Sequence, residues 1–206
     1  MNISKEFTAS FDVDPQKGFT PICPNELPVP KGDEIAAPLN EQAKMARIRV
    51  VSKDAHPATA TWRATEAKPQ FSEVDGDNMD IRWNIHCVPG TQGFELLDDL
   101  PKVNDYDFAV YKGIEPDMHP YGACYHDLAS TKSTGVVEYL KSEGITTVIV
   151  GGLATDYCVK TTAIQLREAG FEVIVNLAAC RGIDFNTVKD AIKEMKATGV
   201  NVLDSL

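Results

Sequence analysis

Short segments rich in β-branched residues alternate with amphipathic segments through the second half of this chain, and this alternation restricts the fold more than any other feature. Strands are predicted over residues 108–111, 146–150, 171–175 and 200–203. Helices are predicted between them, over residues 133–143, 156–169 and 185–198. Near-continuous apolar strands joined by helices form parallel sheets with both faces covered. The sequence therefore predicts a three-layer, doubly wound α/β fold around a mostly parallel central sheet.

The first half of the chain adds fewer regular elements. Strands are predicted over residues 7–13 and 48–52, with a helix from about residue 34 to 47 between them. Asp33 has the side chain of an N-cap for this helix. Pro38 lies inside the helical pattern, so a later start of the helix is the alternative.

Two long segments show neither the two-residue period of a strand nor the 3.6-residue period of a helix. Residues 15–32 are rich in Pro and Gly and are predicted to hold no regular element. Residues 53 to about 100 are irregular, and a segment of that length is usually functional or disordered. Because 206 residues are the size of one domain, we expect a single domain, 1–206, that carries a long loop region at about 53–100.

The composition excludes some partners. Thirty Asp and Glu against twenty Lys and Arg give a formal net charge of −10, and phosphate binding needs clustered bases, so no nucleic-acid or anionic-membrane surface is expected. The apolar runs are too short for a bilayer, and the first ten residues lack a signal core. The five Cys form no Cys-x-x-Cys pair, which indicates reduced thiols. We therefore expect a cytoplasmic protein.

Titratable side chains follow the ends of four predicted strands. Asp14 follows the first, Asp54 and His56 the second, Lys112 the third and Cys158 the fourth. Right-handed crossovers place every strand-to-helix loop at one edge of a parallel sheet, where ligands bind. Together these side chains indicate covalent hydrolysis beside a metal ion.

Cys158 is the candidate nucleophile. Gly151 and Gly152 allow a tight turn after the strand, and Thr155 is a good N-cap for the next helix. Cys158 would then lie in the first helical turn, where free N–H groups stabilise a thiolate or an oxyanion. The alternative is a small buried hydrophobic residue at a helix start.

Two carboxylates and one amine are candidate partners of Cys158. Strand alternation puts Asp12 and Asp14 on one face, so either could reach the site, although an Asp at a strand end is most often a turn residue. Lys112 is by default a solvated edge residue. Near a thiolate and a carboxylate it would act as a fixed positive charge.

A divalent-metal set is the interpretation of Asp54, His56 and the distant His86. Three protein ligands would leave open positions, as catalytic sites do; loop histidines without a metal are the alternative. Phe19 and Trp83 either pack the loops or stack on a flat aromatic substrate. His119 and His126 have no clear partners in the sequence, and no phosphate-binding or dinucleotide fingerprint is present.

The motifs resemble those of the nicotinamidases in the isochorismatase-like cysteine hydrolase superfamily. Residues 13–19 (VDPQKGF) resemble Val-Asp-x-Gln-x-x-Phe, and residues 27–34 (LPVPKGDE) resemble Leu-x-Val-x-Gly-Asp-Glu. Residues 53–57 (KDAHP) and 83–93 (WNIHCVPGTQG) resemble the metal segments. Residues 152–159 (GLATDYCV) resemble the nucleophile loop, and Lys112-Gly113 the catalytic lysine.

This resemblance implies a role for each matching residue. The catalytic triad would be Asp14, Lys112 and Cys158, which decides between the two aspartates. The oxyanion hole would be the backbone N–H groups of Ala154 and Cys158, with a cis Leu153–Ala154 peptide. One divalent ion (Zn, Fe or Mn) would bind Asp54, His56 and His86. The substrate-binding residues would be Phe19, Trp83 and Tyr121.

The resemblance also implies an activity: hydrolysis of nicotinamide to nicotinate and ammonia in NAD salvage, with action on pyrazinamide, by a homo-oligomer that takes small-molecule substrates. The alternatives are an isochorismatase, a ureidoacrylate-type amidase or a catalytically silent interaction protein on this fold. Residues 119–124 (HPYGAC) depart from the family's Asp-Ser-Tyr-Ser-Ala-Phe, and residues 178–180 (AAC) depart from its Asp-Ala before Arg-Gly. The first departure leaves the substrate range open.

Overall fold

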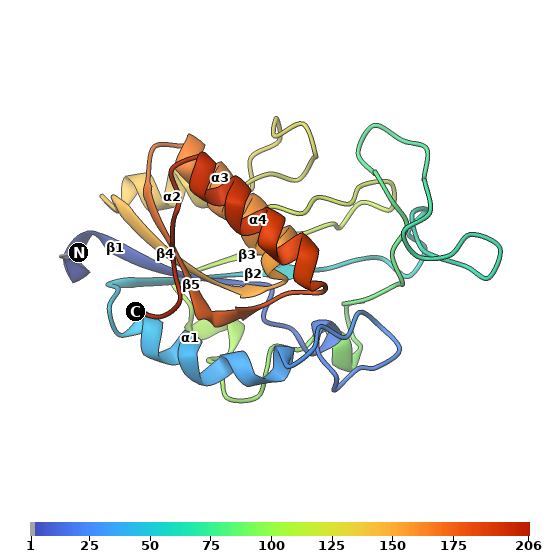
Figure 1. The fold of residues 1–206 in the computed structure, drawn as a ribbon, viewed down its shortest axis with the longest axis horizontal. Helices are drawn as coiled ribbons and strands as arrows, with labels where there is room; N and C mark the ends of the chain where they lie inside the picture. Colours follow the sequence, from blue (N-terminus) through green and yellow to red (C-terminus); the bar gives the residue numbers. More distant parts are fainter. Residues whose placement is uncertain (1–2) are drawn as a thin grey trace.

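Six parallel strands form the central sheet in the computed structural model of the protein, which describes residues 3–206. The strands are β1 (Thr8–Val13), β2 (Ile48–Asp54), β3 (Phe108–Lys112), β4 (Thr147–Leu153), β5 (Glu172–Arg181) and β6 (Asn201–Leu203). Their order is β3-β2-β1-β4-β5-β6, and every neighbouring pair is parallel (Figure 1). The predicted doubly wound sheet is confirmed, and its order reverses between β1 and β4, where such folds bind ligands.

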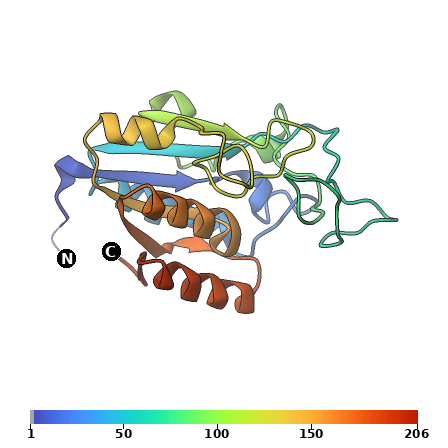
Figure 2. The same ribbon diagram turned by 90° about the horizontal axis from the view of Figure 1, so that it is seen from above.

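Helices cover both faces of the sheet. They are α1 (Ala36–Ala43), α2 (Val136–Ser142), α3 (Lys160–Glu168) and α4 (Phe185–Ala197). Figures 1 and 2 show α1 on one face and the other three on the opposite face. The core is divided accordingly. One cluster of buried residues joins α2, α3 and α4 to the strands, and a second joins α1 to the long loops.

The start of α1 differs from the prediction. A 3₁₀ helix, Gly32–Ile35, precedes α1, and neither element has a side-chain cap, so the prediction of Asp33 as an N-cap is wrong. Pro38 is the third residue of α1. It is tolerated because the N–H groups of the first turn have no partner within the helix. The preceding loop also holds a short 3₁₀ helix, Lys17–Phe19, in a segment predicted to have no regular element.

The nucleophile loop also differs from the prediction. Thr155 is not an N-cap, because residues Thr155–Val159 form a π turn that runs into α3. The N–H groups of Tyr157 and Val159 both donate to the Ala154 carbonyl. A bond to the fifth residue back widens the turn, and that wide turn replaces the expected helical start around Cys158.

The irregular segment predicted from residue 53 to about 100 begins two residues later, because β2 includes Lys53 and Asp54, and residues 55–107 of the described chain contain no strand or α-helix but are packed rather than loose. Trp62, Trp83 and Cys87 are each at most 1% exposed. Figure 1 shows the teal part of this segment beyond one end of the sheet, whereas the yellow-green part that leads to β3 runs back on the side of α1. Within residues 3–206, every helix is too short or too polar to span a lipid bilayer.

Candidate active site

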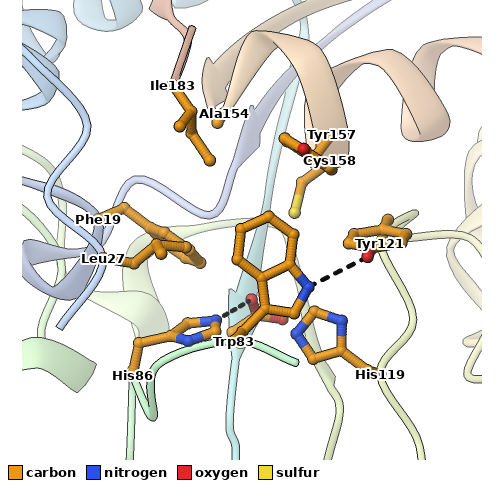
Figure 3. A pocket seen from close by; sticks show the side chains of 11 residues that line it. Phe19, Leu27, Trp83, His86, His119, Tyr121, Ala154, Tyr157, Cys158 and Ile183 are labelled. Atoms are coloured by element: carbon orange, nitrogen blue, oxygen red, sulfur yellow. Dashed lines mark hydrogen bonds and ion pairs between the residues drawn. The ribbon is translucent and has the colours of Figure 1, made fainter. Parts of the chain in front are cut away.

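A pocket opens where β1 to β4 end, and residues from distant segments line it (Figure 3). Asp54 is the last residue of β2, Cys158 lies in the π turn after β4, and aromatic side chains come from the loops. The full lining is Phe19, Leu27, Asp54, Trp83, His86, His119, Tyr121, Ala154, Tyr157, Cys158 and Ile183. The candidate nucleophile, two of the three candidate metal ligands (Asp54 and His86) and the aromatic walls therefore face one space.

Asp14, Lys112 and Cys158 meet beside this pocket. Lys112 Nζ lies 3.0 Å from Asp14 Oδ2 and 3.7 Å from Cys158 Sγ. Asp14 and Lys112 are fully buried and Cys158 is 5% exposed. Ser52 Oγ donates to the other Asp14 oxygen at 2.7 Å, which fixes the carboxylate. The structure thus brings together the three residues predicted to form the triad.

The close approach of β1 and β4 explains this meeting. Val13 pairs with Gly152 in the parallel register, and a Cβ on Gly152 would overlap the Val13 carbonyl oxygen. Gly152 also has φ of +138°, which side chains rarely adopt. Glycine at this position therefore lets the loop after β4 lie against the end of β1, where Asp14 follows.

Asp12 does not reach the pocket, contrary to the alternation argument. It pairs with Arg49 at 2.7 Å and accepts a hydrogen bond from the Tyr106 hydroxyl at 2.9 Å. Asp14 has left the strand conformation, with φ of 44°. That backbone turn gives Asp14 a direction that a period of two does not describe.

Burial sets the protonation of the three groups. It raises the pKa of the Asp14 carboxyl to about 6, against the lowering effect of Lys112. Burial opposes the charge of Lys112, but the Asp14 and Asp54 carboxylates outweigh it and hold the pKa of that ammonium well above its usual range. Burial also raises the pKa of the Cys158 thiol well above its usual range. Cys158 is therefore a thiol at rest, not the helix-stabilised thiolate expected, and a base must remove its proton.

Asp54 joins the triad to a group of histidines. One carboxylate oxygen accepts a hydrogen bond from Lys112, and the other lies 3.3 Å from His56 Nε2 and 3.7 Å from His86 Nε2. The side-chain amide of Gln16 holds the Asp54 backbone at both ends, accepting from its N–H at 2.7 Å and donating to its carbonyl at 2.9 Å.

Backbone carbonyls orient both histidines. His56 Nδ1 lies 3.1 Å from the Gly113 carbonyl, and His86 Nδ1 lies 2.7 Å from the Asn84 carbonyl. An Nδ1–H that donates to a carbonyl leaves the Nε2 lone pair facing the Asp54 carboxylate. Two acceptors at that distance need a cation between them, and this is how metal-binding histidines are commonly held. The residues therefore fit a divalent ion.

His119 was missed as a site residue. It is 4% exposed, and one ring nitrogen each from His56, His86 and His119 can be chosen so that all three lie within 4.8 Å of one another. The sheet order contains the signal that could have found it. Because β3 neighbours β2, the loop after Lys112 must pass beside the loop that carries His56.

Aromatic side chains form the walls of the pocket. Trp83 is 1% exposed, and its Nε1 donates to the Tyr121 hydroxyl at 3.1 Å. That hydroxyl donates to Asp80 at 2.7 Å. Phe19 lies against the His86 ring, with the centroids 5.0 Å apart. Trp83 therefore packs the loop and also lines the pocket, so the two alternatives for it are not exclusive.

The backbone after β4 contains the remaining predicted feature. The Leu153–Ala154 peptide is cis, as the resemblance implied, and Ala154 and Cys158 both line the pocket. The role of their N–H groups as an oxyanion hole stays a prediction.

Comparisons with known proteins agree with this arrangement. Residues 8–205 match the family described as Isochorismatase domain. A nicotinamidase of Acinetobacter baylyi is 35% identical over 199 residues, which cover 94% of this chain and 90% of that protein.

Solved structures agree as well. An Acinetobacter baumanii nicotinamidase/pyrazinamidase has a TM-score of 0.88 at 33% identity, with 96% of each chain covered. A Pyrococcus horikoshii pyrazinamidase in complex with zinc has a TM-score of 0.76 at 30% identity, covering 96% of this chain and 98% of the other. The chain therefore belongs to the isochorismatase family, in which these relatives are nicotinamidases and pyrazinamidases.

Proposed function

We propose that the chain is a metal-assisted cysteine amidohydrolase that converts nicotinamide to nicotinate and ammonia. One observation carries the proposal: a buried Asp14–Lys112–Cys158 group shares an aromatic-walled pocket with a carboxylate–histidine cluster. The related nicotinamidases support the choice of substrate.

The geometry supports a two-stage reaction. Asp14 takes the Cys158 proton, and the sulfur attacks the amide carbon while the N–H groups of Ala154 and Cys158 hold the oxyanion. Asp14 then returns the proton to the departing ammonia, leaving a thioester on Cys158. Water, deprotonated by Asp14, adds to the thioester, and the thiol leaves with that proton. Lys112 keeps Asp14 and Cys158 in place throughout.

Asp54, His56 and His86 would hold the divalent ion, since Asp54 Oδ2 faces the Nε2 atoms of both histidines while Lys112 pairs with the other carboxylate oxygen. When bound, such an ion supplies a fixed positive charge with open positions that order water and the pyridine nitrogen. Imidazole ligands suit zinc or iron better than manganese. The zinc complex of the Pyrococcus horikoshii relative supports zinc as the first candidate.

Ammonia release is the direct test. The purified protein is expected to release ammonia from nicotinamide and pyrazinamide, to lose the activity on chelation and to regain it on metal addition. Isochorismate, a vinyl ether, is the control substrate. Turnover of isochorismate alone would support the isochorismatase alternative. If none of the three compounds is turned over, the catalytically silent interaction protein is supported.

Metal content gives a second expected result. Metal-replete protein should carry about one divalent ion per chain, and His86→Ala should lose most of it, because an imidazole ligand is removed. Elemental analysis after gel filtration measures both. Wild-type protein without any ion under these conditions would contradict the metal site.

Replacement of Trp83 gives a third expected result. Trp83→Leu should raise the KM for nicotinamide roughly tenfold, because a stacked aromatic contact is worth about 0.5–1.5 kcal/mol beyond its area. Trp83→Phe is the matched control: it keeps an aromatic ring but is smaller and loses the donor to Tyr121, so its KM should change less. If both variants lose thermal stability at unchanged KM, Trp83 only packs the loop.

Cellular context completes the proposal. We infer a cytoplasmic enzyme of NAD salvage, built as one domain over residues 1–206 and assembled as a homo-oligomer. The five cysteines are free and buried, which fits a reducing compartment. Light scattering of the purified protein tests the assembly, and fractionation of the source cells tests the compartment.

A further inference from the structure

We propose that His119 is a fourth protein ligand of the divalent ion, so that the ion is held by three imidazoles and one carboxylate. This inference rests on the metal site of the proposed function and assigns it a residue that the sequence motifs do not contain.

The burial of His119 is the first observation. Its side chain is 4% exposed, yet neither ring nitrogen has a hydrogen-bond partner among the described residues. Buried polar groups are normally hydrogen-bonded, and an exception needs an explanation such as a missing ion. His119 lines the same pocket as His86, so its ring is aimed into the site rather than lost in the core (Figure 3).

The second observation is distance. Ring nitrogens of His56, His86 and His119 lie within 4.8 Å of one another. Ligand nitrogens at about 2.0–2.1 Å from one zinc ion cannot be further apart than about 4.2 Å, so small side-chain adjustments would bring all three to bonding distance. Asp54 is already 3.3 Å from His56 Nε2.

The third observation is how the ring is held. The His119 ring stacks on the His56 ring, with the centroids 5.1 Å apart and an interplanar angle of 18°. It also packs against the Trp62 ring in a T-shaped arrangement, with the centroids 4.4 Å apart. The backbone N–H of His119 donates to the Asn78 carbonyl at 2.8 Å, so the backbone of His119 is anchored too. Ring packing and this anchor therefore position His119 although its nitrogens have no partner, which is the arrangement of a preformed ligand.

This ligand set has chemical consequences. Three imidazoles and a carboxylate suit zinc, iron or cobalt rather than magnesium or calcium. With four protein ligands, a position for water or the pyridine nitrogen stays open only if the ion is five- or six-coordinate. The ion would also tie the loop after β3, which carries His119 and Tyr121, to the loop after β2, which carries His56.

Cobalt binding tests the proposal without using activity. Protein stripped with a chelator is titrated with Co²⁺, and the dissociation constant and visible spectrum are recorded for wild type, His119→Ala, His119→Asn and His86→Ala. His126→Ala is the matched control, since that histidine does not line the pocket. His119→Asn keeps a similar shape if the alanine variant does not fold.

The expected result is that both His119 variants weaken Co²⁺ binding at least about tenfold and change its visible spectrum, while His126→Ala does neither. His119→Asp, which supplies an oxygen ligand, should recover part of the affinity with a different spectrum. Wild-type affinity and spectrum in the His119 variants, while His86→Ala fails to bind, would overturn this inference alone. If the His119 variants keep the wild-type Co²⁺ affinity but show a raised inhibition constant for nicotinate, His119 is a substrate contact and not a metal ligand. No Co²⁺ binding by wild type would overturn the metal site and this inference together.

Discussion

Replacing Cys158 with alanine is expected to abolish ammonia release from nicotinamide. The structure brings only this one of the five cysteines to Lys112, at 3.7 Å, with the Asp14 carboxylate beside it. Its thiol has a raised pKa and needs that base, and among the described residues that line the pocket it is the one cysteine. The variant should still fold, since only one sulfur atom is lost, in the π turn before α3.

Ammonia release, thermal melting and nicotinate binding measure this result. Cys124→Ala is the matched control, because Cys124 is also buried but does not line the pocket, and this variant should keep turnover. A thioester trapped by rapid quench should map to Cys158 by mass spectrometry. An acyl group on Cys87, or normal turnover in Cys158→Ala, would refute the nucleophile.

Lys112→Met is expected to reduce both turnover and stability. Lys112 lies fully buried between Asp14 and Asp54, and methionine keeps the length of the side chain without its charge. Breaking a buried ion pair by removing one partner costs about 3–5 kcal/mol of unfolding free energy, because uncompensated charge remains. Turnover should fall by roughly 10²–10⁴, the share of positioned proton transfer.

The pH dependence of the stability of Lys112→Met separates the effect of uncompensated buried charge from a loss of packing. Without Lys112, the folded-state pKa of Asp14, which burial already raises to about 6, rises further, and the pKa of Asp54, which Lys112 helps to hold low against its burial, rises as well. Their protonated forms then favour the folded state, so the stability loss should be small at acidic pH and grow as the pH rises through the raised values.

Urea unfolding of the metal-free variant at pH 5 and pH 8 measures this. The control is Lys53→Met, since Lys53 is 5% exposed on the neighbouring strand and stacks on the Phe94 ring rather than on a carboxylate. An equal loss of stability at both pH values would argue against the buried charges as the cause.

Most of the fold could be predicted because local patterns determine it. Apolar β-branched runs separated by helical periods describe a parallel sheet, and the predicted strands agree with the structure, although β4 and β5 run further than their periods indicated. The helix starts at Asp33 and Thr155 were wrong. There, a 3₁₀ helix and a π turn take the place of side-chain caps, and tertiary contacts choose between such turns.

The sequence by itself determined the parallel sheet and the residues at its carboxyl edge, because strand periodicity and right-handed crossovers place Asp14, Lys112 and Cys158 there. Strand periodicity alone left Asp12 and Asp14 open and the family resemblance favoured Asp14, but the tertiary structure supplied the physical reason, because a single positive φ redirects that side chain and leaves no periodic trace. It also decided the resting thiol of Cys158, since a pKa depends on burial and on charges from other strands. The tertiary structure also placed His119 beside His56 and His86. Ring nitrogens from three loops meet there because of the order of the strands in the sheet, which no local sequence pattern contains.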